Sequence, residues 1–315
     1  CRLASKQADH ALERARYVQG IVEEKQVIVK RAGEYSEKME KITEIPSSLA
    51  KMTFLHTTKH RYWDKSVDLP NTHVHSFSQQ VLAQMVERDH QHANRLKEFT
   101  ADHICRTFPS WKELKGDNSV NVDPLFQWAV GCQIVAMNYS HFDEHVLKAD
   151  GRFRRNGSSG YVLKPDALLN YDALIERPEA WTISVLCGSC LPSPQSKQGN
   201  SGGINPFVLL TVYGGAIESK SASHRTRVVP KNGFNPIWDD KKGFTFKATT
   251  PSTSILVFQV YNKSENGSEE LIAATAVPVS CMREGYRSVA LFDKNHSRAG
   301  AHAHACLLVR AQQLG

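Results

Sequence analysis

The second half of the chain, from Trp181 onward, breaks into short strand-like segments, and this pattern limits the possible folds more than any other feature. Eight such segments follow one another: WTISVLCG, FVLLTVYGG, RTRVV, GFTFKAT, ILVFQVYN, LIAATAVPV, SVALFD and ACLLVRA. Turn-forming clusters such as PSPQSKQGNSGG and PKNGFNP separate them. Regularly spaced short strands divided by turn residues predict an antiparallel β-sandwich over 181–315.

Residues 46–167 have a different texture, in which strand-like and helix-like segments alternate. KMTFLHT, ICRTFP, GCQIVAMNY and GYVLKP are short and apolar, as strands are, whereas SFSQQVLAQMVERDHQHANRLKEF has helical spacing, with Ser76 or Ser78 as its N-cap. Strands separated by helices predict parallel β/α units. Four strands are too few for a closed barrel of about eight. The fold class is therefore α/β plus all-β: half of a TIM-like (β/α) barrel, followed by an eight-stranded antiparallel β-sandwich.

Two further segments are predicted as connectors. Residues 1–45 are dense in charge, with nine basic and eight acidic side chains and a loose helical spacing of apolar residues, and they predict a charged helical linker. Residues 168–180 predict a second linker between the half barrel and the sandwich.

Charge is distributed unevenly along the chain. The total is 39 basic against 32 acidic residues, a formal net charge of +7, and residues 181–315 hold 14 basic and 8 acidic groups, so they carry +6 of it. This excess predicts an anionic partner such as a membrane surface rather than a nucleic acid. No apolar run approaches the roughly 20 residues of a membrane-spanning helix, and seven scattered cysteines favour a reduced compartment. We therefore expect a cytoplasmic, peripheral membrane protein.

Three pairs of potential metal ligands are present: Cys187 with Cys190, His73 with His75, and His302 with His304. None is followed by the second pair that a structural zinc site needs. A strand that runs into a loop explains the cysteines better, and solvated loop positions explain the histidines better, so we predict no metal site from them.

Three strings carry a resemblance to a known family: HSFSQQ at 75–80, GCQIVAMNYS and GRFRRNGSSGYVLKP within 131–165, and VVPKNGFNPIWDD with EGYRSVALFDKNH. In this order they resemble the C-terminal part of eukaryotic phosphoinositide-specific phospholipase C. The resemblance implies the end of the linker between the X and Y halves of the barrel (1–45), the Y half (46–167) and a C2 domain (181–315). It also implies hydrolysis of phosphatidylinositol phosphates to diacylglycerol and inositol phosphates at membranes. The alternative is a catalytically inactive phospholipase C-like protein that binds lipid or acts as a scaffold.

The resemblance also implies roles for individual residues. Ser76 and Arg106 match residues that bind a phosphate of the inositol ring, and Phe108 stands where the family has a Tyr beside that ring. Trp111, with Lys112 and Lys115, matches a loop that contacts the membrane, and Lys164 is expected to be structural. The catalytic His residues and the ligands of the catalytic Ca²⁺ belong to the X half of the same protein. We therefore expect no catalytic residue in this chain and no activity of the chain alone.

The C2 domain departs from the calcium-binding pattern of its family. Asn205, Lys231 and Asn262 stand at positions where calcium-binding relatives have ligands. Ca²⁺ requires six to eight oxygen ligands, mostly carboxylates, so we predict no Ca²⁺ site in this domain. A basic face is expected to contact anionic lipid instead, and it comprises Lys220, Arg225, Arg227 and Lys231.

Overall fold

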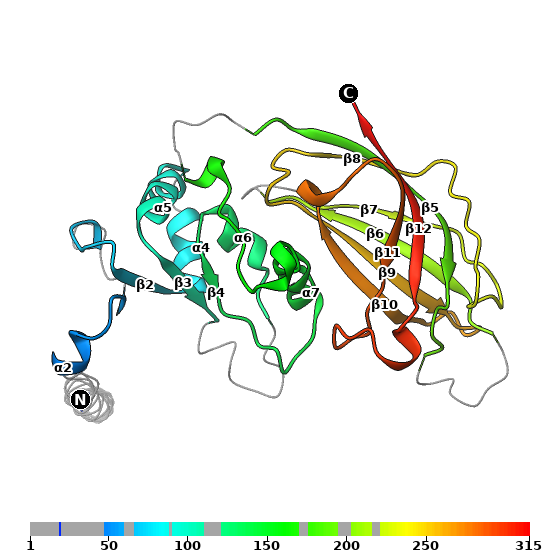
Figure 1. Cartoon of the computed structure of the whole chain (residues 1–315), viewed down its shortest axis with the longest axis horizontal. Helices are drawn as coiled ribbons and strands as arrows, with labels where there is room; N and C mark the ends of the chain where they lie inside the picture. Colours follow the sequence, from blue (N-terminus) through cyan, green and yellow to red (C-terminus); the bar gives the residue numbers. More distant parts are fainter. Residues whose placement is uncertain are drawn as a thin grey trace, which may run out of the picture. The chain divides into compact units, whose positions relative to one another are not determined.

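The computed structural model describes Gln19 and residues 47–59, 66–87, 90–109, 121–169, 176–194, 203–215 and 221–315 (Figure 1). The chain divides into two compact units, 1–56 and 57–315. In the first unit the described structure is chiefly a short helix, α2 (Ser47–Ala50). The linker predicted at 1–45 lies outside the described residues, apart from Gln19. Among the described residues, no helix is both long and apolar enough to cross a bilayer.

The N-terminal part of the second unit is built around a four-stranded sheet in the order β1-β2-β3-β4. Its strands are β1 (His56–Lys59), β2 (His73–Ser78), β3 (Cys105–Phe108) and β4 (Ile134–Val135). β2 pairs with β3 and β3 with β4, both in parallel. The helices are α4 (Gln79–Glu87), α5 (His90–Asp102), α6 (Pro124–Ala129) and α7 (Glu144–Phe153), with 3₁₀ turns η1 (Asn156–Ser158) and η2 (Asp166–Leu168). Parallel strands joined through helices form half of a TIM-like barrel, as predicted.

The long helix predicted from SFSQQ onward is wrong in its first residues and in its continuity. The residues HVHSFS form strand β2, which buries Val74, His75 and Phe77. The helical part begins at Gln79 and is divided into α4 and α5. Of the two proposed caps, Ser78 takes the role, since its Oγ accepts a hydrogen bond from the Val81 backbone N–H at 3.3 Å. Ser76 lies inside the strand.

Other predicted strands are shorter or missing. The KMTFLHT strand begins only at His56, and GYVLKP contains no strand: Tyr161 is 69% exposed and Leu163 83%. GCQIVAMNY, predicted as a buried strand, keeps only the two residues of β4, of which Ile134 is 45% exposed. The helices α6 and α7 were not predicted, although Asp123 and Asp143 cap them through bonds to backbone N–H groups at 3.1 and 3.0 Å.

The C-terminal part is the predicted eight-stranded antiparallel sandwich. One sheet has the order β10-β9-β6-β7 and the other β11-β12-β5-β8. The strands are β5 (Glu179–Ser189), β6 (Pro206–Tyr213), β7 (Ala222–Arg225), β8 (Phe244–Ala248), β9 (Ile255–Lys263), β10 (Glu269–Pro278), β11 (Gly285–Ala290) and β12 (Cys306–Leu314). Only β7 differs clearly from its predicted position, since it ends at Arg225, the first residue of the predicted RTRVV strand. Inward-facing residues of both sheets, including Trp181, Val208, Phe258 and Leu307, form one core.

A separate apolar cluster joins the half barrel to the sandwich. Leu125, Trp128 and Leu147 from α6 and α7 pack with Ile255 and Val257 of β9 and with Ala274 and Ala276 of β10. The approach of α7 to β10 is close, since a Cβ atom added to Gly151 would lie 2.6 Å from the Cβ of Ala276.

A buried cation lies beside this cluster. Lys148 is 1% exposed, and its Nζ lies 3.0 Å from an Asp123 carboxylate oxygen, 3.4 Å from one of Glu144 and 3.8 Å from the ring centre of Tyr213. Its charge is therefore balanced by residues of α6 and α7 and by a ring from β6.

Candidate substrate-binding face

The register of the parallel sheet places three side chains in one row across it. Ser76 pairs with Arg106, and Arg106 pairs with Ile134. Paired residues of neighbouring strands project to the same face, and residues two apart along a strand share it. Ser78 and Phe108, which also pair, therefore extend the same face toward the carboxyl ends of the strands. In barrels of this type, sites are built at that end.

The opposite face of the sheet is closed by helices. His75, Phe77, Cys105 and Thr107 project to it and are all buried. Phe77 and Cys105 pack with residues of α4 and α5. The His75 ring makes an edge contact with Phe99, whose ring stacks at 4.3 Å on that of His103. His75 therefore contributes to the core, and the face that carries Ser76 and Arg106 is the one the helices leave open.

Arg106 and Phe108 are in contact on the open face. The guanidinium carbon of Arg106 lies 5.4 Å from the centre of the Phe108 ring, a cation–π distance. Both side chains are only partly buried. The arginine presents several N–H donors beside an apolar ring, which suits a ligand that carries both an anionic group and an apolar ring face.

The two serines of β2 differ in what their hydroxyls do. Ser78 caps α4, as described above. The Ser76 Oγ is buried and has no hydrogen-bond partner among the described residues. A buried hydroxyl without a partner costs free energy, so this group is suited to a bound ligand or water. Since α4 begins at Gln79, its N-terminus lies close along the chain to this hydroxyl.

Lys164 lies near the other end of the strands, as a structural residue would. Its Nζ donates a hydrogen bond to the backbone oxygen of Thr100 at 2.6 Å, and it sits beside Gly131, which has φ +85°. Burial lowers the pKa of Lys164 to about 8. Burial likewise raises the pKa of the Cys132 thiol to about 12, and that of Cys105 is raised for the same reason.

One member of the open face was missed by sequence reasoning. Ile134 was assigned to a buried strand, yet it lies in the row with Ser76 and Arg106 and is 45% exposed. Alternation in the sequence gives no signal for it, because Cys132, two residues earlier, is buried whereas Ile134 is exposed. It adds an apolar contact to the face.

At one end of the sandwich, the residues at the expected calcium positions bind one another. The Asn205 Oδ1 accepts a hydrogen bond from the Lys231 backbone N–H at 2.9 Å, and its Nδ2 donates to the Lys263 oxygen at 2.8 Å. The Asn262 Oδ1 accepts from the Asn205 N–H at 2.9 Å. These side chains are amides rather than carboxylates, and their oxygens already accept hydrogen bonds from backbone N–H groups. Among the described residues, no group of three or more His, Cys, Asp or Glu side chains could hold a metal.

The residues predicted to contact the membrane are only partly described. Trp111, Lys112, Lys115 and Lys220 lie outside the described residues. Lys231 is exposed. Arg225 forms a bidentate pair with Glu269 and stacks on Phe207 at 3.6 Å, while Arg227 donates to the backbone oxygens of Ile237 and Trp238. Both arginines therefore also stabilise the sandwich.

Comparison with known families agrees with both parts of the fold. Residues 49–167 match the model of the phosphatidylinositol-specific phospholipase C Y domain, and residues 180–293 match the C2 domain. The crystal structure of L. pealei PLC21 superposes with a TM-score of 0.71 over 89% of this chain and 36% of its own, at 18% identity. That of S. officinalis PLC21 gives 0.69 over 83% of this chain and 32% of its own, at 20% identity. At these identities the structures show the fold alone.

The chain therefore combines a phospholipase C Y domain with a C2 domain that follows it. The human 1-phosphatidylinositol 4,5-bisphosphate phosphodiesterase delta-1 is 31% identical over 219 residues, which are 66% of this chain and 27% of that protein. The mouse zeta-1 protein of the same description is 35% identical over 215 residues, 64% of this chain and 31% of that protein. The chain belongs to the eukaryotic phosphoinositide-specific phospholipase C family and corresponds to its C-terminal part. It spans about 30% of the length of these relatives.

Proposed function

We propose that this chain is the substrate-binding wall of a phosphoinositide phospholipase C, with the half barrel within 46–167 and the C2 domain within 181–315. The complete protein hydrolyses phosphatidylinositol phosphates to diacylglycerol and inositol phosphates at membrane surfaces. Its close relatives are named as phosphodiesterases of phosphatidylinositol 4,5-bisphosphate, which supports this substrate class. The single observation that carries the proposal is the shared open face of Ser76, Arg106 and Phe108.

Each of these side chains has a role that its chemistry suits. The Arg106 guanidinium holds a phosphate of the inositol ring through paired N–H donors. The Ser76 hydroxyl, which has no hydrogen-bond partner in the described part of the chain, donates to a phosphate oxygen beside it. Phe108 packs against the apolar face of the inositol ring, and, unlike a tyrosine, it adds no hydrogen bond. These residues bind and orient the head group, and the acid–base groups come from the X half of the complete protein.

Calcium, in this proposal, binds to residues of the X half in the complete site and not to the C2 domain. When bound in family members, Ca²⁺ offsets negative charge on the phosphodiester. In the C2 domain, the amides of Asn205 and Asn262 do not fit Ca²⁺, because their oxygens already accept backbone hydrogen bonds. We propose that this domain instead binds anionic lipid at the membrane surface through its net positive charge. The segment that carries Trp111, Lys112 and Lys115 contacts the same membrane.

The experiment is the substitution Arg106→Ala in the complete protein. A charge-assisted hydrogen bond to phosphate contributes about 1.5–3 kcal/mol. Hydrolysis of phosphatidylinositol 4,5-bisphosphate should therefore fall roughly tenfold to a hundredfold, while that of unphosphorylated phosphatidylinositol falls much less. Arg95→Ala, an exposed arginine of α5, is the matched control and should leave both rates unchanged. Equal losses on the two substrates would show that Arg106 does not bind a ring phosphate.

A second readout separates the enzyme from the non-catalytic alternative. Binding of the complete protein to phosphoinositide vesicles is measured beside release of inositol phosphate. Binding without release would favour a lipid-binding or scaffold protein and reject the proposed hydrolysis.

A further inference from the structure

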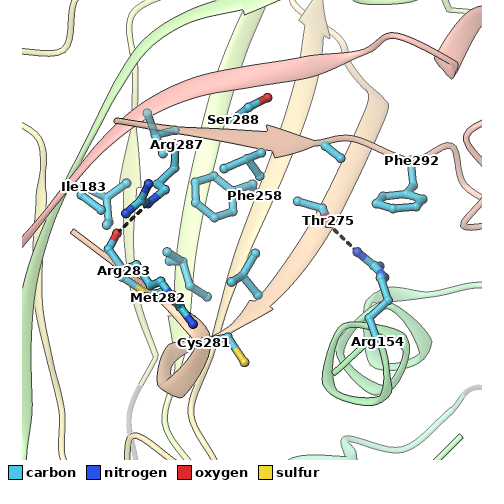
Figure 2. Close-up of a pocket in the computed structure, with 16 residues that line it drawn as sticks. Arg154, Ile183, Phe258, Thr275, Cys281, Met282, Arg283, Arg287, Ser288 and Phe292 are labelled. Carbon is cyan, nitrogen blue, oxygen red and sulfur yellow. Dashed lines mark hydrogen bonds between the residues drawn. The ribbon is translucent and has the colours of Figure 1, made fainter. Parts of the chain in front are cut away.

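The β-sandwich contains a cavity of about 380 Å³ between its two sheets, which is separate from the open face of the barrel (Figure 2). Ligand pockets begin at about 300 Å³, and an apolar cavity of about 150 Å³ is enough to take up benzene. Its walls are mainly aliphatic and aromatic, with contributions from both sheets: Ile183, Leu256, Phe258, Val277, Val289 and Val309.

The cavity exists because two edge strands separate. β10 is the edge of one sheet and β11 the edge of the other. The chain just beyond β11 bridges to β10 where Ala274 and Phe292 exchange two backbone hydrogen bonds of 2.9 Å. Beyond this bridge the chain crosses from β10 to β11 through the 3₁₀ turn η4 (Val279–Cys281) and the following residues. The space between the bridge and this turn is the cavity, and its boundaries are therefore set by backbone.

An arginine projects from β11 toward this space. Arg287 pairs with Val309, and Val289 with Leu307, and both partners belong to the sandwich core. Directly paired residues share a face, so Arg287 lies on the inner face of its strand, as Figure 2 shows. Its guanidinium donates to the backbone oxygens of Arg283 and Glu284. A charged residue on the inner face of an edge strand guards against pairing with other chains, but that role needs no cavity behind it.

The mouth of the cavity is cationic. Arg283 also lines it and, like Arg287, is exposed and has no ion pair among the described residues. At the other end, Arg154 donates to the Thr275 hydroxyl at 3.0 Å but is neutralised by Asp150. Glu284, which follows Arg283 in the sequence, accepts a hydrogen bond from the Gln313 N–H through its carboxylate. The Arg287 guanidinium donates to backbone oxygens once each through Nε, Nη1 and Nη2, which leaves two of its five N–H groups, beside the exposed Arg283 guanidinium, for an anion.

We propose that this cavity binds a single fatty acid, with its tail between the sheets and its carboxylate at Arg283 and Arg287. The apolar walls suit a hydrocarbon chain, and guanidinium groups match the paired oxygens of a carboxylate. A single chain fits a cavity at the lower end of the range for ligand pockets. The proposal is independent of the phospholipase activity, since none of the residues on the barrel face takes part.

The test is calorimetric titration of the 315-residue chain with octanoate, decanoate and dodecanoate below their micellar concentrations. Each buried methylene strengthens binding about fourfold, so two added methylenes should lower Kd by roughly fifteenfold until the cavity is full. Dodecanol, which has the tail without the charge, should bind more weakly than dodecanoate. Arg287→Gln should weaken dodecanoate about tenfold and leave dodecanol unchanged. Arg310→Gln, on the outer face of β12 in the same sheet, is the matched control and should change neither.

Ala311→Phe provides a second variant, because Ala311 lines the cavity opposite Gly285. A phenyl ring there should abolish binding if the variant keeps the wild-type near-ultraviolet circular dichroism; if it does not, Arg287→Gln alone decides. Absence of binding by the wild-type chain would overturn the proposal. So would dodecanoate binding that is unaffected by Arg287→Gln. Binding by this chain but not by the complete protein would show that another protein segment fills the cavity, and would also overturn it.

Discussion

Lys148 offers the sharpest test of how the half barrel and the sandwich hold together. Its ammonium lies 3.0 and 3.4 Å from two carboxylate oxygens and is 1% exposed. At an effective dielectric constant of about 20, each contact contributes roughly 5 kcal/mol of attraction. Desolvating the ammonium costs several kcal/mol, so most of this attraction is offset. The contact with the Tyr213 ring adds about 2 kcal/mol when it is shielded from water.

The perturbation is Lys148→Met, which keeps the aliphatic stem and removes the charge. Breaking a fully buried pair costs about 3–5 kcal/mol. Asp123 and Glu144 remain 41% and 32% exposed, so water can solvate them, and we expect a smaller loss of about 2–3 kcal/mol in the free energy of unfolding.

The assay is urea unfolding of the 315-residue chain, followed by tryptophan fluorescence, since Trp128 lies in the cluster that joins the two parts. Lys241→Met, at a lysine whose side chain is 87% exposed, is the matched control and should change stability by less than about 0.5 kcal/mol. A Lys148→Met variant as stable as the wild type would refute the reasoning, because the desolvation cost would then equal the whole attraction.

Three further outcomes follow from the site and its surroundings. The chain alone should release no inositol phosphate from mixed phosphoinositide vesicles with Ca²⁺ present, because Ser76, Arg106 and Phe108 of its proposed binding face are not acid–base groups; turnover above a blank without protein would contradict this. The chain should bind phosphatidylserine vesicles less tightly as salt rises, since salt screens charge attraction, and a chelator should have no effect; binding seen only with Ca²⁺ would restore a calcium site. The pKa of Lys164 is lowered from 10.5 to about 8 in the folded chain. Between these two pH values the unfolded chain therefore keeps the Lys164 proton that the folded chain has lost. The contribution of this group to the free energy of unfolding consequently rises with pH. Wild type should gain stability relative to Lys164→Met from pH 8 to pH 10, as measured by urea unfolding at each pH, and a constant difference would argue against the lowered pKa.

The sandwich could be predicted well because its strands carry strong local signals. Alternating or continuous apolar residues, with turn clusters between them, located seven of the eight strands closely. The exception, β7, has the exposed residues Ala222 and Ser223, and its position depends on pairing with β6 rather than on apolar residues of its own.

The half barrel was harder to predict because its elements are short and partly polar. Strand β2 buries His75, and His and Ser residues hide the alternation of HVHSFS. Helices α6 and α7 are brief, and their clearest signals are the capping residues Asp123 and Asp143. Family resemblance named Ser76, Arg106 and Phe108, but their common face depends on the register of two strands 30 residues apart in sequence. The pairing of Arg225 with Glu269 likewise arises only in the folded sandwich.

The close contact between Gly151 and Ala276 has a consequence for how this protein can change over time. Helix α7 and strand β10 approach so closely that a methyl group on Gly151 would overlap its neighbour. The registration of the two parts therefore depends on this contact rather than on the length of the chain that connects them. Insertions or deletions in the chain between η2 and β5 should be accepted readily, whereas a single added carbon at residue 151 should not. The sequence of this connecting segment can therefore diverge during evolution while Gly151 is retained.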